Sequence, residues 1–201
     1  MDRSYKGQRL PKVIASSVIR STHQGESHGG VYIVDLHTER VDQIIDWDNE
    51  SIDWRGRGGD RGLRGIAFYD TKVYLAASDE IYVYDRDFRL LESYRNRYLD
   101  HCHEIWVDGD YLLITSTGYD AILVFNLRTR QFERGYVCRF GQLTRSSILL
   151  RLLLKLRLKP KLDFFDPNNS NGPSKADTLH INSVSSLKGK VFFGGVKLGN
   201  L

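Results

Sequence analysis

A unit of four short β-rich segments occurs twice in succession, and this repeat constrains the fold more than any other feature. The first copy comprises segments 65–68, 73–78, 81–85 and 90–94, and the second comprises 104–107, 112–117, 122–126 and 131–135. The offset between copies is 39 residues for the first two segments and 41 for the third. Asp, Gly, Asn or Ser turns separate the segments, and no helix-length stretch lies between them. The repeat therefore predicts antiparallel up-and-down sheets rather than βαβ units.

Partial copies of the same unit flank these two. Residues 13–17, 31–35 and 41–45 match the second to fourth segments, and 180–184 and 191–195 match the first and second. A four-stranded repeat of about 40 residues is typical of a β-propeller blade. We therefore expect an all-β chain of about three and a half blades, each a four-stranded antiparallel sheet. Because a closed ring needs four to eight blades, residues 1–201 are expected to form a single, incomplete propeller domain.

The strand segments also resemble a known family. The relevant segments are Gly65-Ile66-Ala67, Val73-Tyr74-Leu75-Ala76 and Ile81-Tyr82-Val83-Tyr84-Asp85. They resemble NHL-type and gluconolactonase-like six-bladed propellers, and related uncharacterised bacterial propellers with an Asp-x-x-His stretch like that from Asp100 to His103. The resemblance covers roughly residues 12–139 and 179–195. It implies a six-bladed fold and, for gluconolactonase-like enzymes, a divalent cation held by carboxylates and Asn at the tunnel mouth. The sequence does not match that full ligand set, so no catalytic residue is transferred.

Positive charge is concentrated in one segment. The chain has a net charge of +4, yet residues 141–161 contain six Lys and Arg and no acid, so the remainder is slightly acidic. A nucleic-acid-binding surface across the fold is therefore not expected. The first ten residues are polar, unlike a signal peptide, and two cysteines fit a reducing compartment, so a cytoplasmic location is expected. No apolar stretch is long enough to predict a membrane-spanning helix.

Residues 146–159 carry the one helical pattern. Ile and Leu residues form a broad apolar face, Arg151, Lys155 and Lys159 recur at four-residue spacing, and Pro160 ends the pattern. This predicts an amphipathic helix within a helical and linker insertion at residues 140–178, between blades. The helix could pack on the propeller, or it could dock on a protein partner or an anionic membrane surface. We expect part of its leucine face to be exposed.

Propeller geometry predicts where a site would lie. The first strand of each blade lines the central channel, and long connections at one end of these strands usually carry binding groups. Arg64, His103 and His180 occupy the same position in the repeat, at that end of the channel-lining strands. Their neighbours along the chain include Asp100, Glu104, Asp177 and Asn182. The sequence therefore predicts a ring of polar side chains at the channel mouth.

Three interpretations of this ring stay open. The histidines His103 and His180 could bind a divalent metal ion, since imidazole suits several transition metals. Alternatively, Arg64 and the two histidines could bind a small polar or anionic ligand through charge-assisted hydrogen bonds. A purely structural role, with side chains capping strands and bonding to neighbouring blades, is the third. If Cys102 lies in a strand, then His101 and His103 lie on one side of it.

The polar segment 47–62 extends the candidate site. Its residue Trp54 suits stacking against a ligand, and the Gly and Arg alternation around Arg57 suits close approach to an anion. A phosphate-binding P-loop is not indicated, because no Lys-Ser or Lys-Thr pair and no helix follows. The alternative is a surface loop between blades.

These patterns predict a ligand-binding propeller with a polar pocket at the channel mouth. The predicted pocket residues are Arg64, His103, Glu104, His180 and Asn182, with Trp54 and Arg57. One alternative is a metal-dependent hydrolase or lyase that uses the same pocket, with a histidine as general base. The other is an interaction platform held at a protein or membrane surface by residues 146–159. The sequence is compatible with a binding protein and with an enzyme.

Overall fold

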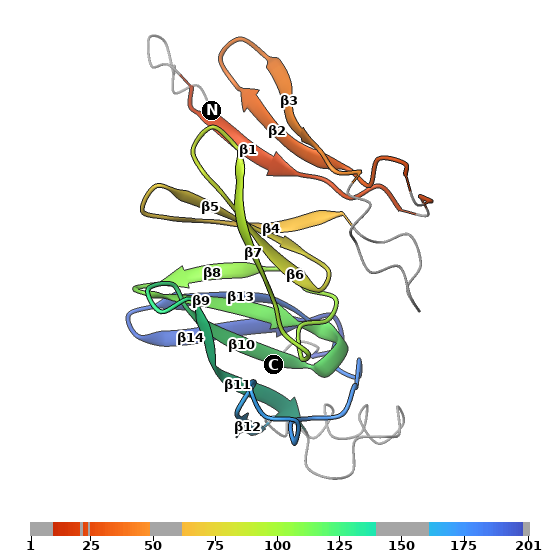
Figure 1. Ribbon diagram of the computed structural model, residues 1–201, viewed down its shortest axis with the longest axis vertical. Helices are drawn as coiled ribbons and strands as arrows, with labels where there is room; N and C mark the ends of the chain where they lie inside the picture. The colour runs from red at the N-terminus through yellow and green to blue at the C-terminus, as the bar shows by residue number, and fades with distance from the viewer. Residues whose placement is uncertain (1–9, 21, 24, 49–61, 140–160, 199–201) are drawn as a thin grey trace, which may run out of the picture. The chain divides into compact units, whose positions relative to one another are not determined.

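The computed structural model describes residues 10–20, 22–23, 25–48, 62–139 and 161–198, and these residues are all-β (Figure 1). They form antiparallel sheets of two to five strands and one 3-10 turn, Thr117–Tyr119. Among them no helix is long and apolar enough to cross a membrane. The chain divides into two compact units, residues 1–63 and 64–201. The single-domain organisation stays a prediction.

The first unit holds a three-stranded sheet, which we call the first sheet. Its strands are β1 (Lys12–Ser16), β2 (Gly30–Asp35) and β3 (Arg40–Asp46), and they pair in the order β1-β2-β3. All pairs are antiparallel. These strands correspond to the second, third and fourth segments of the repeat, as the sequence predicts.

The second unit contains two sheets that correspond to the complete copies of the repeat. The second sheet is formed by β4 (Leu63–Tyr69), β5 (Lys72–Ala77), β6 (Glu80–Tyr84) and β7 (Leu90–Arg95). The third sheet contains β8 (Ile105–Asp108), β9 (Tyr111–Ser116), β10 (Ala121–Asn126) and β11 (Gln131–Arg139). Strands β5 and β9 begin 39 residues apart, whereas β6 and β10 begin 41 residues apart. The repeat and its change of offset are therefore confirmed, and the fold is propeller-like.

A fifth strand, β12 (Lys161–Phe165), extends the third sheet beyond the expected four. It pairs antiparallel with β11, with Phe165 opposite Gly135. The ring of Phe165 occupies the space that a side chain at position 135 would need. Residues 161–165, which were expected to belong to a helical and linker insertion, therefore form a strand that packs an aromatic ring over Gly135. The predicted helix at 146–159, with Arg151, Lys155 and Lys159, lies outside the described residues and stays a prediction.

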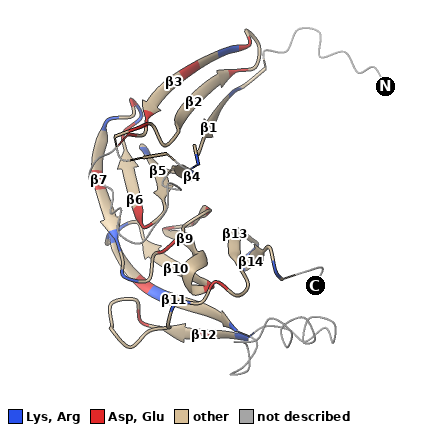
Figure 2. Cartoon of the chain, turned by 90° about the vertical axis from the view of Figure 1, so that its right-hand side faces the viewer, with Lys and Arg blue, Asp and Glu red and all other residues tan. Residues whose placement is uncertain are grey.

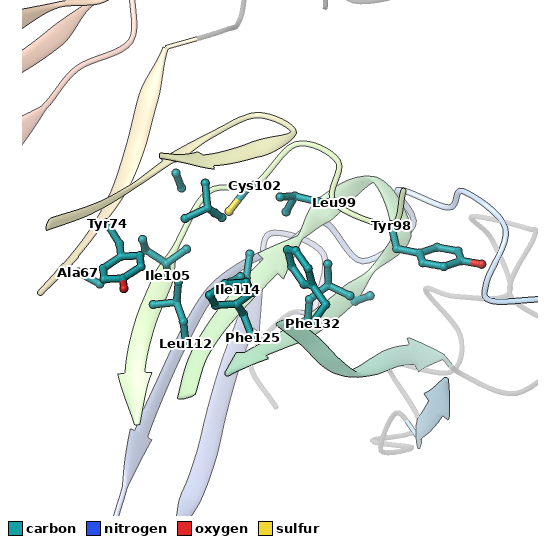
Figure 3. Packing of buried hydrophobic residues seen from close by; sticks show 14 of the residues in the cluster. Ala67, Tyr74, Tyr98, Leu99, Cys102, Ile105, Leu112, Ile114, Phe125 and Phe132 are labelled. Carbon is teal, nitrogen blue, oxygen red and sulfur yellow. The ribbon is translucent and has the colours of Figure 1, made fainter. Parts of the chain in front are cut away.

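Apolar side chains cover both faces of the third sheet. One face packs against the second sheet, through residues such as Ala67, Tyr74, Ile105, Leu112, Ile114, Phe125 and Phe132 (Figure 3). The other face packs against the fourth sheet, formed by β13 (Ile181–Leu187) and β14 (Lys190–Gly195). Because side chains alternate along a strand, a sheet lying between two others must be apolar on both faces. This stacking matches a blade between two neighbouring blades.

The connection from β12 to β13 is held by hydrogen bonds to Tyr98, which lies between β7 and β8, and to strand β11 of the third sheet. The Tyr98 hydroxyl donates to the Asn169 carbonyl at 2.8 Å and accepts the Gly172 N–H at 2.7 Å. The Asn168 side-chain amide donates to the Phe132 carbonyl at 2.7 Å. These bonds hold residues 168–172 against Tyr98 and strand β11.

Charges of both signs occur together on the outer strands β7 and β11 (Figure 2). Glu92 of β7, for example, bonds to Lys72 at 2.9 Å and to Arg130 at 3.2 Å.

The orientation of β12 can be tested with two adjacent phenylalanines. Phe165 is 8% exposed and Phe164 is 64% exposed. We expect Phe165→Ala to lower the free energy of unfolding by about 3 kcal/mol, the usual effect of removing a buried aromatic ring. Phe164→Ala should change it by less than about 0.5 kcal/mol. Equal effects of the two substitutions in denaturant titrations would contradict this assignment.

Candidate functional site

Two of the predicted site residues lie in ring contact at the start of their strands. The ring centroids of His103 and His180 are 5.4 Å apart, with the ring planes tilted by 48°. His103 precedes β8 and His180 precedes β13, so the packing of the third and fourth sheets brings them together. Arg64 lies in β4, half-buried, and its positive charge acts on His103.

The ring of His103 is oriented by a threonine. Its Nδ1 lies 3.2 Å from the Thr117 hydroxyl oxygen, and that hydroxyl donates its single proton to the Ile181 carbonyl at 2.6 Å. The hydroxyl can therefore only accept from His103, so Nδ1 carries the ring proton. In the neutral ring the lone pair then lies on Nε2.

The ring of His180 is oriented by a carboxylate. Its Nδ1 lies 2.9 Å from Asp177 Oδ1, and an ionised carboxylate only accepts hydrogen bonds, so Nδ1 donates. The neutral form of His180 therefore also carries its lone pair on Nε2. Neither Nε2 atom has a hydrogen-bond partner among the residues that the structure describes.

His103 is held in its neutral form. Burial is the largest cause, and the charges of Arg64, His180 and His101 add to it, so that the pKa of His103 falls from 6.5 to about 4. Asp177 acts in the opposite direction with a smaller effect. At neutral pH this ring therefore presents a lone pair rather than a proton at Nε2.

Asp120, which was not among the residues predicted from the sequence, positions His180. Its carboxylate accepts the backbone N–H groups of Thr178, Leu179 and His180 at 2.7–3.0 Å. Burial raises the pKa of Asp120, while these backbone bonds lower it. One sequence signal points to this residue. The β9–β10 turn that contains Thr117 and Asp120 is two residues longer than the β5–β6 turn, which is where the offset changes from 39 to 41.

Glu104 and Asn182 are not shown to lie at the histidine pair. Glu104 lines a separate hollow of about 410 Å³ with Trp106, Ser183 and Phe192, and burial raises its pKa. Asn182 lies in an irregularity of the β13–β14 pairing, between Ile181 opposite Gly195 and Ser183 opposite Gly194. Trp54 and Arg57 lie outside the described residues.

The expected strand alternation of His101 and His103 is wrong. Strand β8 begins only at Ile105, so Cys102 does not lie in it. His101 instead has a left-handed backbone, with φ of 53°, and its Nδ1 lies 3.2 Å from Asp100 Oδ1. Cys102 is fully buried, and burial raises its pKa to about 12, so it is not a nucleophile at neutral pH.

The cation site that the family resemblance implies does not fit the described residues. Among them no group of three or more His, Cys, Asp or Glu side chains gathers where one metal ion could bind. Asp177 bonds to His180, and Glu104 lines another hollow.

The chain matches no protein-family model and no curated protein. Among solved structures, the AfRom2 CNH domain is 16% identical, with 59% of this chain and 38% of that chain covered and a TM-score of 0.38. Saccharomyces cerevisiae Sqt1 is 14% identical, with 84% and 37% covered and a TM-score of 0.44. The Neurospora crassa Pan2 WD40 domain is 12% identical, with 81% and 48% covered and a TM-score of 0.39. The chain thus spans less than half the length of these structures, and at such TM-scores the fold assignment rests on its own sheets.

The protonation of His103 can be tested by pH titration. Since its pKa is about 4 in the folded chain and 6.5 ordinarily, the unfolded chain binds the extra proton between these pH values. The contribution of neutral His103 to the free energy of unfolding is therefore fully present above pH 6.5 and is lost as the pH falls toward 4. We expect NMR titration of the His103 ring to give a midpoint well below 6. Between pH 7 and pH 5, the His103→Gln variant should lose less stability than the wild type, and an equal loss would contradict this.

Proposed function

We propose that this chain binds a small polar ligand at the pair formed by His103 and His180. One observation carries the proposal: the protein holds both Nδ1–H groups, through Thr117 and Asp177, and this leaves two Nε2 lone pairs on adjacent rings. Ring orientation through the second nitrogen is how proteins prepare a histidine to interact with something else.

The lone pairs favour a particular ligand chemistry. A neutral imidazole Nε2 accepts a hydrogen bond, so a ligand that contacts it must bring an O–H or N–H donor. The positive charge of Arg64, which acts on His103, disfavours a cationic amine. The proposed ligand is therefore a neutral or anionic small molecule that carries a hydroxyl group. An anion without a donor group would gain nothing from His103 at neutral pH.

The other sequence-based functions stay predictions. Docking to a protein or an anionic membrane depends on residues 146–159, which lie outside the described residues. Metal-dependent hydrolase or lyase activity requires a bound cation and a reacting water in addition to the two rings.

The proposal can be tested by NMR on the full chain with isotope-labelled histidines. A panel of hydroxy acids, polyols and nucleosides should include compounds that shift the His103 and His180 rings and leave the His37 ring unchanged. The Thr117→Val variant keeps the side-chain shape but releases Nδ1 of His103, so affinity for these compounds should fall about tenfold. If no compound shifts the two rings, or if binding is equal in a His103→Ala, His180→Ala double variant, the proposal is wrong.

A further inference from the structure

We infer that the hollow beside Glu104 binds an organic ammonium ion that carries an apolar group. The hollow has a volume of about 410 Å³, and its walls come from the start of β8 and from strands β13 and β14. The side chains that line it include Glu104, Trp106, Ser183, Ser185 and Phe192. It is a different site from the histidine pair, so the inference goes beyond the proposed function and does not rest on it.

Strand alternation places Glu104 and Trp106 on one side of the chain. Ile105, which lies between them, is 1% exposed and belongs to the apolar cluster shared with the second sheet. Glu104 and Trp106 therefore lie on the side of the fourth sheet, where both line the hollow. The Trp106 indole N–H donates to the Ser186 hydroxyl oxygen at 3.0 Å, and this bond holds the ring against β13.

The backbone of Glu104 is fixed by a buried threonine. Its N–H donates to the Thr115 hydroxyl oxygen at 2.9 Å, and its carbonyl accepts the Thr115 N–H at 3.0 Å. The Glu104 carboxylate, in contrast, accepts one hydrogen bond from the residues that the structure describes, from the Ile105 N–H to Oε1 at 3.3 Å. An ionised carboxylate has about four acceptor positions. The position of Glu104 is thus defined, while most of its capacity to accept hydrogen bonds is available to a ligand.

The charge of the hollow favours a cation. Among the described residues that line it, Glu104 is the only charged one, and there is no Lys, Arg or His. The positive charge of Arg64 acts on the pKa of His103, whereas the pKa of Glu104 is raised by burial and lowered by its backbone bond alone. A half-buried carboxylate without a paired cation disfavours an anionic ligand and is stabilised by a cationic one. A metal ion does not fit, because no second carboxylate or other ligating side chain joins Glu104 in a metal-binding group of described residues.

The other lining groups suit the remainder of such a ligand. An ammonium group has three N–H donors, and the Ser183 and Ser185 hydroxyl oxygens add acceptors to the carboxylate in the same hollow. Trp106 and Phe192 are 42% and 52% exposed, so each offers apolar surface that a ligand can cover. Small-molecule sites commonly combine apolar and aromatic walls with a few polar groups in this way. An organic amine with an apolar group uses the carboxylate and both aromatic side chains.

The test is an NMR titration of the full chain with three probes of similar size that differ in charge. These are 2-phenylethylammonium, 2-phenylethanol and 3-phenylpropionate. We expect the ammonium probe to shift the Trp106 indole N–H and the Glu104 amide, and to bind about tenfold more tightly than the alcohol, because its hydrogen bonds to the carboxylate are charge-assisted. The anionic probe should cause no shift at the same concentrations.

Three variants locate the binding. Glu104→Gln keeps the side-chain shape and an acceptor for the Ile105 N–H, so affinity for the ammonium probe should fall about tenfold while affinity for the alcohol stays the same. Glu133→Gln, on β11 and outside the hollow, is the matched control and should bind like the wild type. Phe192→Ala removes an exposed ring and should weaken both probes alike.

The comparison of probes on the wild type decides the inference even if Glu104→Gln fails to fold, which amide spectra establish. Equal affinity of the wild type for the ammonium probe and the alcohol, or no shift with any probe, would overturn the inference. Undiminished binding of the ammonium probe by folded Glu104→Gln would overturn it as well. The His103 and His180 rings report separately on the proposed function, so either site can fail without the other.

Discussion

The buried carboxylate of Asp120 accepts the backbone N–H groups of three consecutive residues, and the geometry of the candidate site depends on this interaction. The bonds to Thr178, Leu179 and His180 fix the chain where it enters β13. Asp120 is only 2% exposed, so water could not replace these backbone donors if the hydrogen bonds were lost. Leu179 and Ile181, on either side of His180, are then buried in the apolar cluster between the third and fourth sheets. Side-chain burial and backbone bonding thus hold His180 from both sides.

The same turn also orients the other histidine. Thr117 opens the turn and Asp120 closes it, so one short segment between β9 and β10 contacts both His103 and the residue before β13. Asp120 adopts a left-handed backbone, with φ of 49°, a conformation that Asp and Asn tolerate better than most residues. The corresponding turn between β5 and β6 is two residues shorter. The longer turn in this copy of the repeat therefore supplies Thr117, which orients the ring of His103, and Asp120, which holds the backbone of His180.

Much of the fold could be predicted from the sequence, because strand alternation and turn residues are local signals. The offsets of 39 and 41 residues reappear in the strand starts, and the partial copies form the three-stranded and two-stranded sheets. Strand β12 could not be predicted from strand alternation and turn residues. It pairs with β11 and packs the ring of Phe165 over Gly135, and this contact between distant residues leaves no local pattern in the sequence. Repeat alignment did place His103 and His180 at equivalent positions. It could not reveal Asp120, whose bonds span about sixty residues of sequence, nor show that Glu104 lines a different hollow.

The role of the β9–β10 turn is tested most directly by Asp120→Asn. Asparagine tolerates the left-handed backbone but places an N–H₂ group against the backbone donors of residues 178–180, so the unfolding free energy should fall by about 2 kcal/mol. The amide resonances of Thr178, Leu179 and His180 should shift, and NOEs between the His103 and His180 rings should weaken. Asp85→Asn is the matched control, because a single oxygen of Asp85 accepts the N–H groups of its turn and asparagine retains one. Unchanged stability, amide shifts and ring NOEs in Asp120→Asn would contradict the role assigned to this turn.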